Sequence, residues 1–489
     1  MAILFMVIFL GIMIFINIKN FGVESFDDYA TSKTKFGFVS ISLSVFSTWY
    51  VGASFTAWAT LNVESGFLGA YVIPYASMMI ITIYLVGEKT FLWGKKYKIN
   101  TQAELMGLRY NSRFLRILMA ISAVMFMAPW LLLEWVTQGY LFNYASNGVL
   151  SPFWGMLLGV VVVLVYVATG GMRAVITANI IQGAFMFIVG TGLMFYLLYY
   201  FFGSFTEAMS LLDNKHPDVL TYSGPGSSLP TAYWTSIVIS SGFGAFMWPW
   251  AYNKLFAANS VKSIKQSTLL TPVFSLIFWS AAVFLGQAMH SIEFARENSE
   301  ESYLWIANEA GPLALALMST LIMAASIGTV SGIIQALSTA ISNDIAQVIN
   351  KEISNSQALK IARSSVVGLG IIALIFATID LGALIDIALL TYQGIIMLFP
   401  IVILGLYWKR ANKEGAITAL ILSTILSMYV EFAQPVFFTQ YGWSGGIYGT
   451  VLGFIIMIIF GYLKPVEGHV YMLWDDIKEA KINYNKKAS

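Results

Sequence analysis

Long apolar runs separated by short polar segments dominate this chain. A helix needs roughly 20 mostly apolar residues to cross the hydrocarbon core of a bilayer. Read with a window of that length, the sequence predicts thirteen membrane-spanning helices, because the apolar character surrounds each segment instead of following one face. The predicted spans are 2–18, 37–61, 66–87, 114–142, 152–169, 174–202, 232–253, 268–290, 312–341, 362–379, 381–408, 415–433 and 445–463.

The composition agrees with this pattern. Of the 489 residues, 58% are hydrophobic and 11% are charged, whereas an average soluble protein has about 25% charged residues. The sequence therefore predicts an all-α polytopic membrane protein, and runs of this length do not suit a β-barrel. The chain has no cysteine, which excludes disulfides, thiolate metal sites and thiol nucleophiles. Its histidines, His216, His290 and His469, are far apart in the sequence, so we expect no histidine-ligated metal or haem.

The distribution of basic residues predicts the orientation. The first span begins at Met1 without a basic leader or a clear cleavage site, so we interpret it as a retained helix. With the N-terminus outside, all of the 27 Lys and Arg residues except Lys215 and Arg296 fall in cytoplasmic segments, and Lys254 is counted among them. Because cytoplasmic segments are enriched in basic residues, the sequence predicts a plasma-membrane protein with an external N-terminus and a cytoplasmic C-terminus.

Two predicted spans look discontinuous. Ser44 to Ser54 in the second span and Ser240 to Pro249 in the seventh are rich in Gly, Pro and hydroxyl residues. The two spans are five apart, so spans 2–6 and 7–11 would be two units of opposite orientation, and such paired breaks point to the binding site of a secondary transporter. The predicted organisation is 1–36 (first helix and loop), 37–202 (first repeat), 203–231 (extracellular loop), 232–408 (second repeat), 409–463 (spans 12 and 13) and 464–489 (cytoplasmic tail).

Several motifs carry a family resemblance. The stretch Gly170 to Val175, followed by Asn179 and Gln182, resembles the G-G-x-x-A-V…D-x-x-Q signature of the sodium:solute symporters. Phe399-Pro400 and the stretch from Gly405 to Ala416 also resemble the family, near the end of span 11. These matches, with the thirteen predicted spans, cover nearly the whole chain.

Two further stretches extend the resemblance. Trp248-Pro249, then Lys254 and the stretch Ala257 to Ser260, resemble the W-P-x-x-x-x-R…A-A-x-S pattern after the family's seventh span, and Ser338 to Asp344 resembles its S-x-x-x-x-x-D ending of the ninth. The resemblance implies a LeuT-like fold, with a five-plus-five inverted repeat, one helix before it and two after. It also implies uptake of a small organic solute coupled to sodium.

The family's cation site carries over to spans 2 and 9. The matching positions are the carbonyls of Ser47 and Tyr50 and, on span 9, Ala325, Gly328 and Thr329. Gly328 stands where the family usually has Ser, and Asn179 stands where it usually has Asp. Sodium is a hard cation that needs oxygen ligands, which Thr329 and Ser326 would supply. The coupling cation is thus predicted to be Na⁺, with the proton as the alternative.

Glu134 is the most informative candidate for the solute site. A carboxylate inside a span costs roughly 2.5–3.5 kcal/mol on insertion scales and usually faces a cavity or a partner. Three roles stay open: Glu134 binds an amine group of the solute, carries the coupling proton, or reaches water at the outer end of its span. The remaining solute-site candidates are Trp49, Val51, Ser54, Trp248, Tyr71, Gln138 and Gln393.

We therefore predict a symporter for a small organic solute. N-terminal ends of half-helices favour anions, which favours a monocarboxylate, an amino acid or a similar compound. The expected partners are the solute, a coupling cation and the lipid bilayer, and no nucleic acid. The alternatives are a proton-coupled or uncoupled transporter that uses Glu134, or a membrane sensor that works with a separate partner. No nucleophile–base pair or metal cluster indicates an enzyme.

Overall fold

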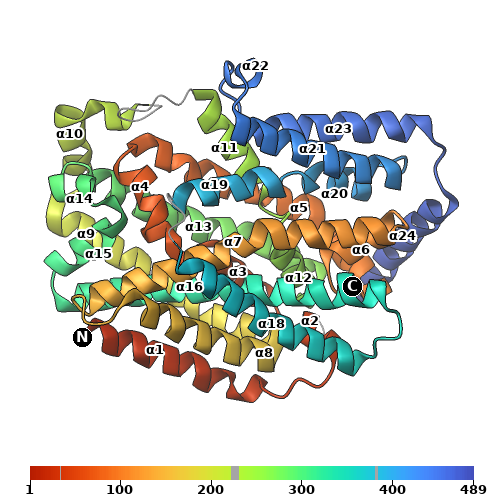
Figure 1. Cartoon of the computed structure of the whole chain (residues 1–489), viewed down its shortest axis with the longest axis horizontal. Helices are drawn as coiled ribbons and strands as arrows, with labels where there is room; N and C mark the ends of the chain where they lie inside the picture. The colour runs from red at the N-terminus through yellow and green to blue at the C-terminus, as the bar shows by residue number, and fades with distance from the viewer. Residues whose placement is uncertain (33–34, 222–230, 380–383, 489) are drawn as a thin grey trace.

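The computed structural model describes residues 1–32, 35–221, 231–379 and 384–488, and within them the protein is a bundle of helices. Most long helices run along the longest axis of the molecule, and the two ends of the chain lie toward opposite ends of that axis (Figure 1). The described residues form no β-sheet, and a single bridge pairs Phe36 with Ala258.

The first twelve α-helices lie between residues 2 and 257. They are α1 (Ala2–Asn17), α2 (Phe26–Thr31), α3 (Phe38–Trp49), α4 (Ala57–Val63), α5 (Val72–Tyr97), α6 (Gln102–Arg109), α7 (Arg113–Ala145), α8 (Pro152–Phe185), α9 (Thr191–Phe202), α10 (Phe205–Lys215), α11 (Thr231–Gly244) and α12 (Pro249–Ala257).

The remaining twelve α-helices lie between residues 261 and 488. Its helices are α13 (Val261–Met289), α14 (Glu293–Glu297), α15 (Ser302–Glu309), α16 (Pro312–Ala340), α17 (Gln347–Ile349), α18 (Asn355–Ala377), α19 (Leu384–Ile395), α20 (Leu398–Tyr407), α21 (Lys413–Ala433), α22 (Val436–Thr439), α23 (Gly445–Leu463) and α24 (Gly468–Ala488).

Ten of the described helical segments are long and apolar enough to cross a membrane, or eleven if α3 and the bent segment after it form one span. The most enclosed segment is 312–349, which contains α16 and is 83% buried over its most apolar window. The windows in α18, α21 and α23 are only 28–33% buried, so these helices form the outside of the bundle around α16. The thirteen-span count and the inverted repeat stay predictions.

Both predicted interruptions are confirmed. Residues 50 and 51 leave the helical conformation after α3, and the following segment is bent by 57° relative to α3. The second interruption separates α11 from α12 at residues 245–248, and Pro249 occupies the first turn of α12, where a missing N–H costs no hydrogen bond.

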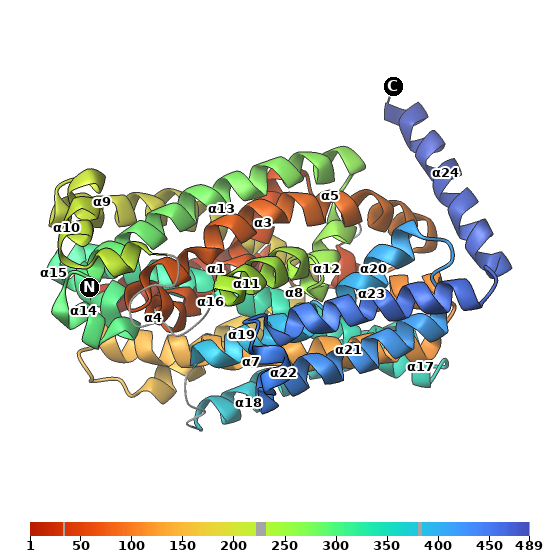
Figure 2. The ribbon, with the colours of Figure 1, turned by 90° about the horizontal axis from the view of Figure 1, so that it is seen from above.

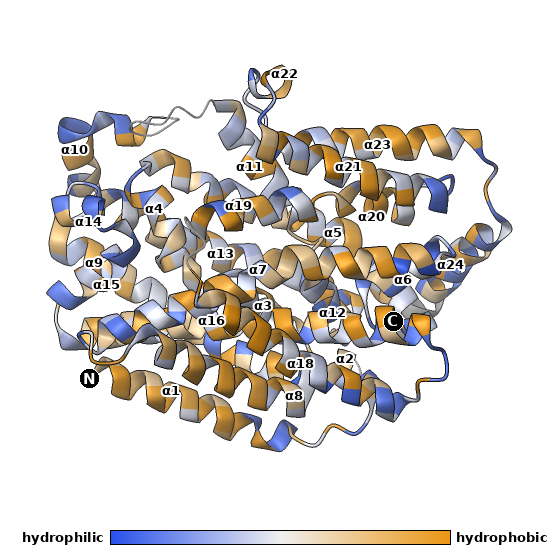
Figure 3. Ribbon diagram, in the orientation of Figure 1, coloured by the Kyte–Doolittle hydropathy of each residue, from blue (hydrophilic) through white to orange (hydrophobic). Residues whose placement is uncertain are grey.

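Polar residues gather at the two ends of the bundle. The short helices α10, α14 and α15 lie at one end, and α24 lies at the other, where it leaves the bundle at a steep angle (Figures 2 and 3). Residues 293–309 form α14 and α15 instead of one continuous helix, because the chain leaves the helical conformation at Asn298 between them. The tail helix α24 is tied to α5, since Asp476 accepts hydrogen bonds from Lys96 and Tyr97. These bonds hold the pKa of the Asp476 carboxyl below its usual range.

Gly171 separates two helices within the segment labelled α8. Its backbone has φ +55° and ψ −145°, and a Cβ atom there would lie 2.6 Å from Tyr29 Cδ2 and 2.7 Å from Tyr29 O. Only glycine adopts this conformation without strain, so this position fixes how the predicted fifth and sixth spans join.

We predict that Gly171→Ala destabilises the protein. A side chain in this conformation costs of order 1–3 kcal/mol, and the contact with Tyr29 adds to that. The melting temperature of the purified protein should fall. Gly368→Ala, at a helical glycine with no heavy atom within 4 Å of its Cβ position, should not lower it, because alanine is the better helix former. An equal effect of both substitutions would contradict the interpretation.

Candidate functional site

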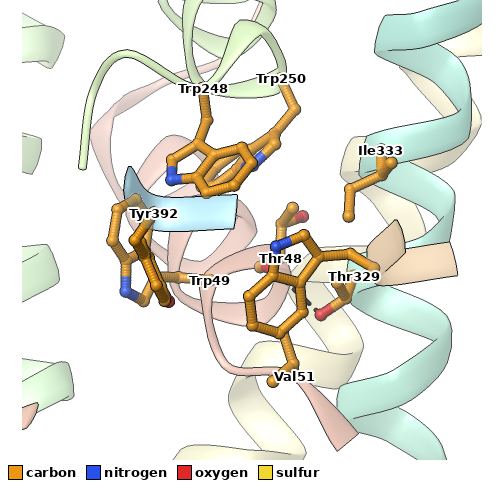
Figure 4. A pocket seen from close by; sticks show the side chains of 9 residues that line it. Thr48, Trp49, Val51, Trp248, Trp250, Thr329, Ile333 and Tyr392 are labelled. Carbon is orange, nitrogen blue, oxygen red and sulfur yellow. Dashed lines mark hydrogen bonds between the residues drawn. The ribbon is translucent and has the colours of Figure 1, made fainter. Parts of the chain in front are cut away.

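A small cavity lies beside the interruption of α3. Its volume is about 30 Å³, close to that of one water molecule. Trp248 and Trp250, at the start of α12, form one side of it, and Thr329 and Ile333 of α16 form another (Figure 4). The residues that line it are Thr48, Trp49, Val51, Trp130, Trp248, Trp250, Thr329, Ile333 and Tyr392.

Aromatic rings hold each other in place around this cavity. The Trp49 ring packs edge-on against Trp250, with centroids 5.5 Å apart, and Trp130 packs in the same way against Tyr392 at 5.8 Å. Two of the indole N–H groups also have fixed partners: Trp49 donates to Tyr75 Oη and Trp130 donates to Thr391 Oγ1, both at 2.8 Å. The walls are therefore largely apolar, with few polar groups to orient a bound molecule.

Glu134 of α7 binds the backbone at the interruption of α3. Gly52 N donates to Glu134 Oε2 at 3.0 Å, and Ala53 N donates to Oε1 at 3.2 Å. These N–H groups start the short 3-10 turn Gly52–Phe55 and have no partner within a helix. The Glu134 side chain is fully buried, so it does not reach water at the outer end of its span.

Two further hydrogen bonds next to Glu134 connect α7 to α16. Gln138 Nε2 donates to Ser326 Oγ at 2.7 Å, and Ser326 Oγ donates to the Glu134 carbonyl at 3.3 Å. Both side chains are buried. Ser326 therefore has two protein partners, which leaves it less able to act as a cation ligand.

The predicted sodium ligands lie where α3 crosses α16. Thr329 Oγ1 donates to Thr48 O at 3.1 Å, whereas Ser47 Oγ is buried without a hydrogen-bond partner. A Cβ atom at Gly328 would lie 2.3 Å from Ser47 Oγ and 2.8 Å from Ser47 O, so the usual serine does not fit without separating the helices. These residues fit a sodium ion only in part, because Ser47 provides oxygen ligands whereas Gly328 provides no hydroxyl group.

Lys254 reaches the same crossing from α12. The sequence assigned it to the cytoplasmic side, but it is fully buried, because α12 directs its side chain into the bundle. Lys254 Nζ donates to Ser44 O at 2.5 Å and to Thr48 Oγ1. With the Asn179 amide oriented so that its hydrogen bonds are satisfied, its oxygen lies 3.3 Å from Nζ.

The structure brings most of the predicted site residues to one region. Trp49, Val51 and Trp248 line the cavity, and Ser54 and Tyr71 line a second cavity that shares Trp49 and Val51 with it. Tyr50 and Ala325 are buried at the α3 interruption and on α16. Gln393 is placed elsewhere: its Oε1 accepts from Gly446 N of α23 at 2.9 Å.

Sequence reasoning missed Thr48, Trp130, Trp250, Ile333 and Tyr392 in the cavity wall and the inward direction of Lys254. Nothing in the pattern of apolar residues distinguishes a cavity-lining Trp or Tyr from one that faces lipid. Lys254 offered a signal, since it follows directly on the predicted seventh span.

Comparisons with known proteins agree with this architecture. Residues 29–423 match the model of the sodium:solute symporter family. The chain is 22% identical to the uncharacterized symporter YodF of Bacillus subtilis (90% of this chain, 88% of that protein) and 23% identical to the sodium/pantothenate symporter of Escherichia coli (86% and 88%). Among solved structures, it superposes on a Na⁺-coupled sialic acid symporter with a TM-score of 0.80 at 17% identity, over 95% of this chain and 98% of the other.

The described helices, with their interruptions around the cavity, have the fold of LeuT-like structural relatives, and ten of the segments are suited to cross a membrane. The chain belongs to the sodium:solute symporter family. Its relatives support cation-coupled symport of a solute as its general activity.

We predict that Glu134→Gln destabilises the α3 interruption. The amide keeps one acceptor oxygen but turns an NH₂ group toward the other backbone N–H, and a buried donor without a partner costs about 1–3 kcal/mol. The melting temperature should fall, whereas Glu293→Gln, at an exposed acid, should have no effect. Unchanged melting of Glu134→Gln would show that Gly52 N and Ala53 N have other partners.

Proposed function

We propose that this protein imports a small organic solute together with a cation across the plasma membrane by alternating access, with its N-terminus outside. The observation that carries the proposal is the buried aromatic cavity, which lies between the α3 interruption and the start of α12. Interrupted helices at mid-membrane are the usual position of the binding site in secondary transporters. The cavity of about 30 Å³ is too small for an organic solute, so the described conformation is closed and has to open during transport.

The walls of the cavity suggest the class of solute. Tryptophan and tyrosine rings favour an apolar or aromatic body, through burial and ring packing. The two N–H groups at the α3 interruption are not free to bind a solute carboxylate, because both donate to Glu134. The start of α12 is the better place for such an anion, since a helix N-terminus is positively polarised and Lys254 Nζ lies 4.9 Å from the Trp250 ring. Monocarboxylates and amino acids with apolar side chains are therefore the first classes to test.

Sodium is the coupling cation that the family resemblance implies. Ser47, Tyr50, Ala325 and Thr329 would hold it, and the unpartnered Ser47 Oγ supports this site. Gly328 and the hydrogen bond from Thr329 Oγ1 to Thr48 O weigh against it. Glu134, the alternative carrier of a proton, has both carboxylate oxygens bound by backbone N–H groups.

A ligand screen on the purified protein tests the proposal. Carboxylates, amino acids, sugars and vitamins are added in sodium and in potassium buffer at two pH values, and each ligand that binds the folded state raises the melting temperature by mass action. Hits are then tested for uptake into proteoliposomes under a sodium or a proton gradient. Binding without uptake under any gradient would favour the sensor alternative.

We predict that Trp248→Phe weakens binding of a solute found in this way. The loss of an aromatic contact is worth about 0.5–1.5 kcal/mol, which raises Kd about 2- to 13-fold. Trp154→Phe is the matched control, because Trp154 is 59% exposed on the outside of the bundle. Equal Kd values for Trp248→Phe and the unmodified protein would place the solute outside this cavity.

A further inference from the structure

A buried ammonium without a carboxylate partner lies next to the cavity. Lys254 is fully buried on α12, and among the described residues no acid forms an ion pair with it. Burying a charge is costly unless it is paired or well hydrogen-bonded. A lysine inside a membrane domain is therefore a candidate for a functional group.

The atoms around Lys254 Nζ are oxygen acceptors that stabilise a positive charge. An ammonium has three N–H donors and no acceptor. Three oxygens surround it: Ser44 O at 2.5 Å, the Thr48 hydroxyl, and the Asn179 amide oxygen at 3.3 Å. All three belong to neutral groups. They solvate a positive charge as carbonyl and hydroxyl ligands solvate a metal cation.

This ammonium lies beside the predicted sodium ligands. Thr48 Oγ1 accepts from Lys254 and, in this orientation of the Asn179 amide, donates to the Asn179 oxygen at 2.7 Å. The carbonyl of the same Thr48 accepts from Thr329. A sodium ion at this crossing would lie close to that positive charge. The family pattern also has a basic residue at the position of Lys254, but it usually has Asp at the position of Asn179. Asn179, which is neutral, does not offset that charge.

We infer that Lys254 takes the place of the coupling cation, and that the proton on its Nζ, instead of a sodium ion, moves with the solute. In the closed state Nζ holds the proton against Ser44 O and Thr48 Oγ1. When the inner side opens, the proton passes to water and Lys254 is left as a neutral amine. The amine takes a proton from water on the outer side, so each cycle carries one proton. This inference rests on the proposed symport function.

The contacts of Lys254 couple this proton to the solute cavity. Thr48 lines the cavity and also binds Nζ, and the ammonium lies 4.9 Å from the ring of Trp250, another cavity residue. Cations attract aromatic faces within about 6 Å. Loss of the proton therefore changes the hydrogen bonding of one cavity residue and the cation–π contact of another.

No other titratable group near α12 in the described residues forms a hydrogen bond or an ion pair with Lys254 Nζ. Of the helices packed against α12, α3 and α16 carry no titratable side chain. Three acids on the other neighbours pair elsewhere: Asp28 with Arg173, Glu88 with Lys265 and Lys481, and Glu104 with Arg116. The remaining titratable or charged groups are Asp27 and Tyr29 on α2, Tyr75, Tyr84, Lys89, Lys95, Lys96 and Tyr97 on α5, Arg109 on α6, Tyr166 on α8 and Tyr252 on α12 itself.

Two measurements without any solute test the inference, with sodium ions and protons as the only probes. Full-length purified protein is melted over a range of pH in sodium chloride and in N-methyl-D-glucamine chloride of equal ionic strength, and binding of radioactive sodium is measured in parallel. We expect a melting temperature that changes with pH and is the same in the two salts, with no saturable sodium binding. Stability depends on pH when the folded and unfolded states bind different numbers of protons.

Substitutions then assign the proton to Lys254. Lys254→Arg keeps the charge but does not release its proton, so we expect a smaller dependence of the melting temperature on pH than in the unmodified protein. Lys262→Arg, at an exposed lysine at the start of α13, should keep the full dependence. Where Lys254→Arg does not fold, Lys254→Met serves in its place, because it is neutral at every pH.

Saturable sodium binding, or stabilisation by sodium, would overturn the inference and return the coupling to the Ser47 and Thr329 oxygens. An unchanged pH dependence in Lys254→Arg would overturn it as well. Both results leave symport intact, since uptake driven by a sodium gradient would then be expected. The proposed function fails separately, when no solute of the panel enters proteoliposomes under either gradient.

Discussion

Every backbone N–H and C=O inside a bilayer needs a partner, and this constraint governs the centre of the protein. At the interruption of α3, residues 50 and 51 leave the helical conformation, and the helical hydrogen bonds stop after the one from Tyr50 N to Phe46 O. Glu134 satisfies the N–H groups that begin the second half, and Lys254 binds a carbonyl in the last turns of the first half. The carboxylate lies at the positive end of one half-helix, and the ammonium lies near the negative end of the other. Each charge therefore interacts favourably with the dipole of its half-helix. The interruption is thus stabilised electrostatically from both sides.

The aromatic walls strengthen this arrangement. Trp49, Trp130, Trp248 and Trp250 leave space for about one water molecule in the closed cavity, and interactions between charges and dipoles grow where water is excluded. Trp49 and Trp130 are also fixed by hydrogen bonds to Tyr75 and Thr391. Movement of any of these rings during opening changes both the shape of the cavity and the hydration of the buried charges beside it.

The sequence predicted the parts of this architecture that depend on local chemistry. Long apolar runs predicted the helices, and the Gly, Pro and hydroxyl residues around Ser47 and Trp248 predicted both interruptions. Glu134 was identified because a carboxylate is rare in an apolar span. Its partners were not predicted, since they are backbone groups of a distant segment whose approach depends on tertiary packing. The burial of Lys254 was not predicted for a similar reason: basic residues near span ends usually face water, and only the packing of α12 against α3 turns this one into the bundle.

The tail helix α24 is attached to the rest of the protein by a different kind of contact. Its contacts with α5 include two ion pairs at the surface, Lys96 with Asp476 and Lys481 with Glu88. Beneath them, Trp93 Nε1 of α5 donates to Leu473 O at 3.1 Å. Ion pairs at the surface weaken as salt rises, because mobile ions screen them. The buried contacts around Glu134 and Lys254 are shielded from such screening. A rise in ionic strength therefore weakens the surface ion pairs between α24 and α5, but neither the buried hydrogen bond of Trp93 nor the centre of the bundle.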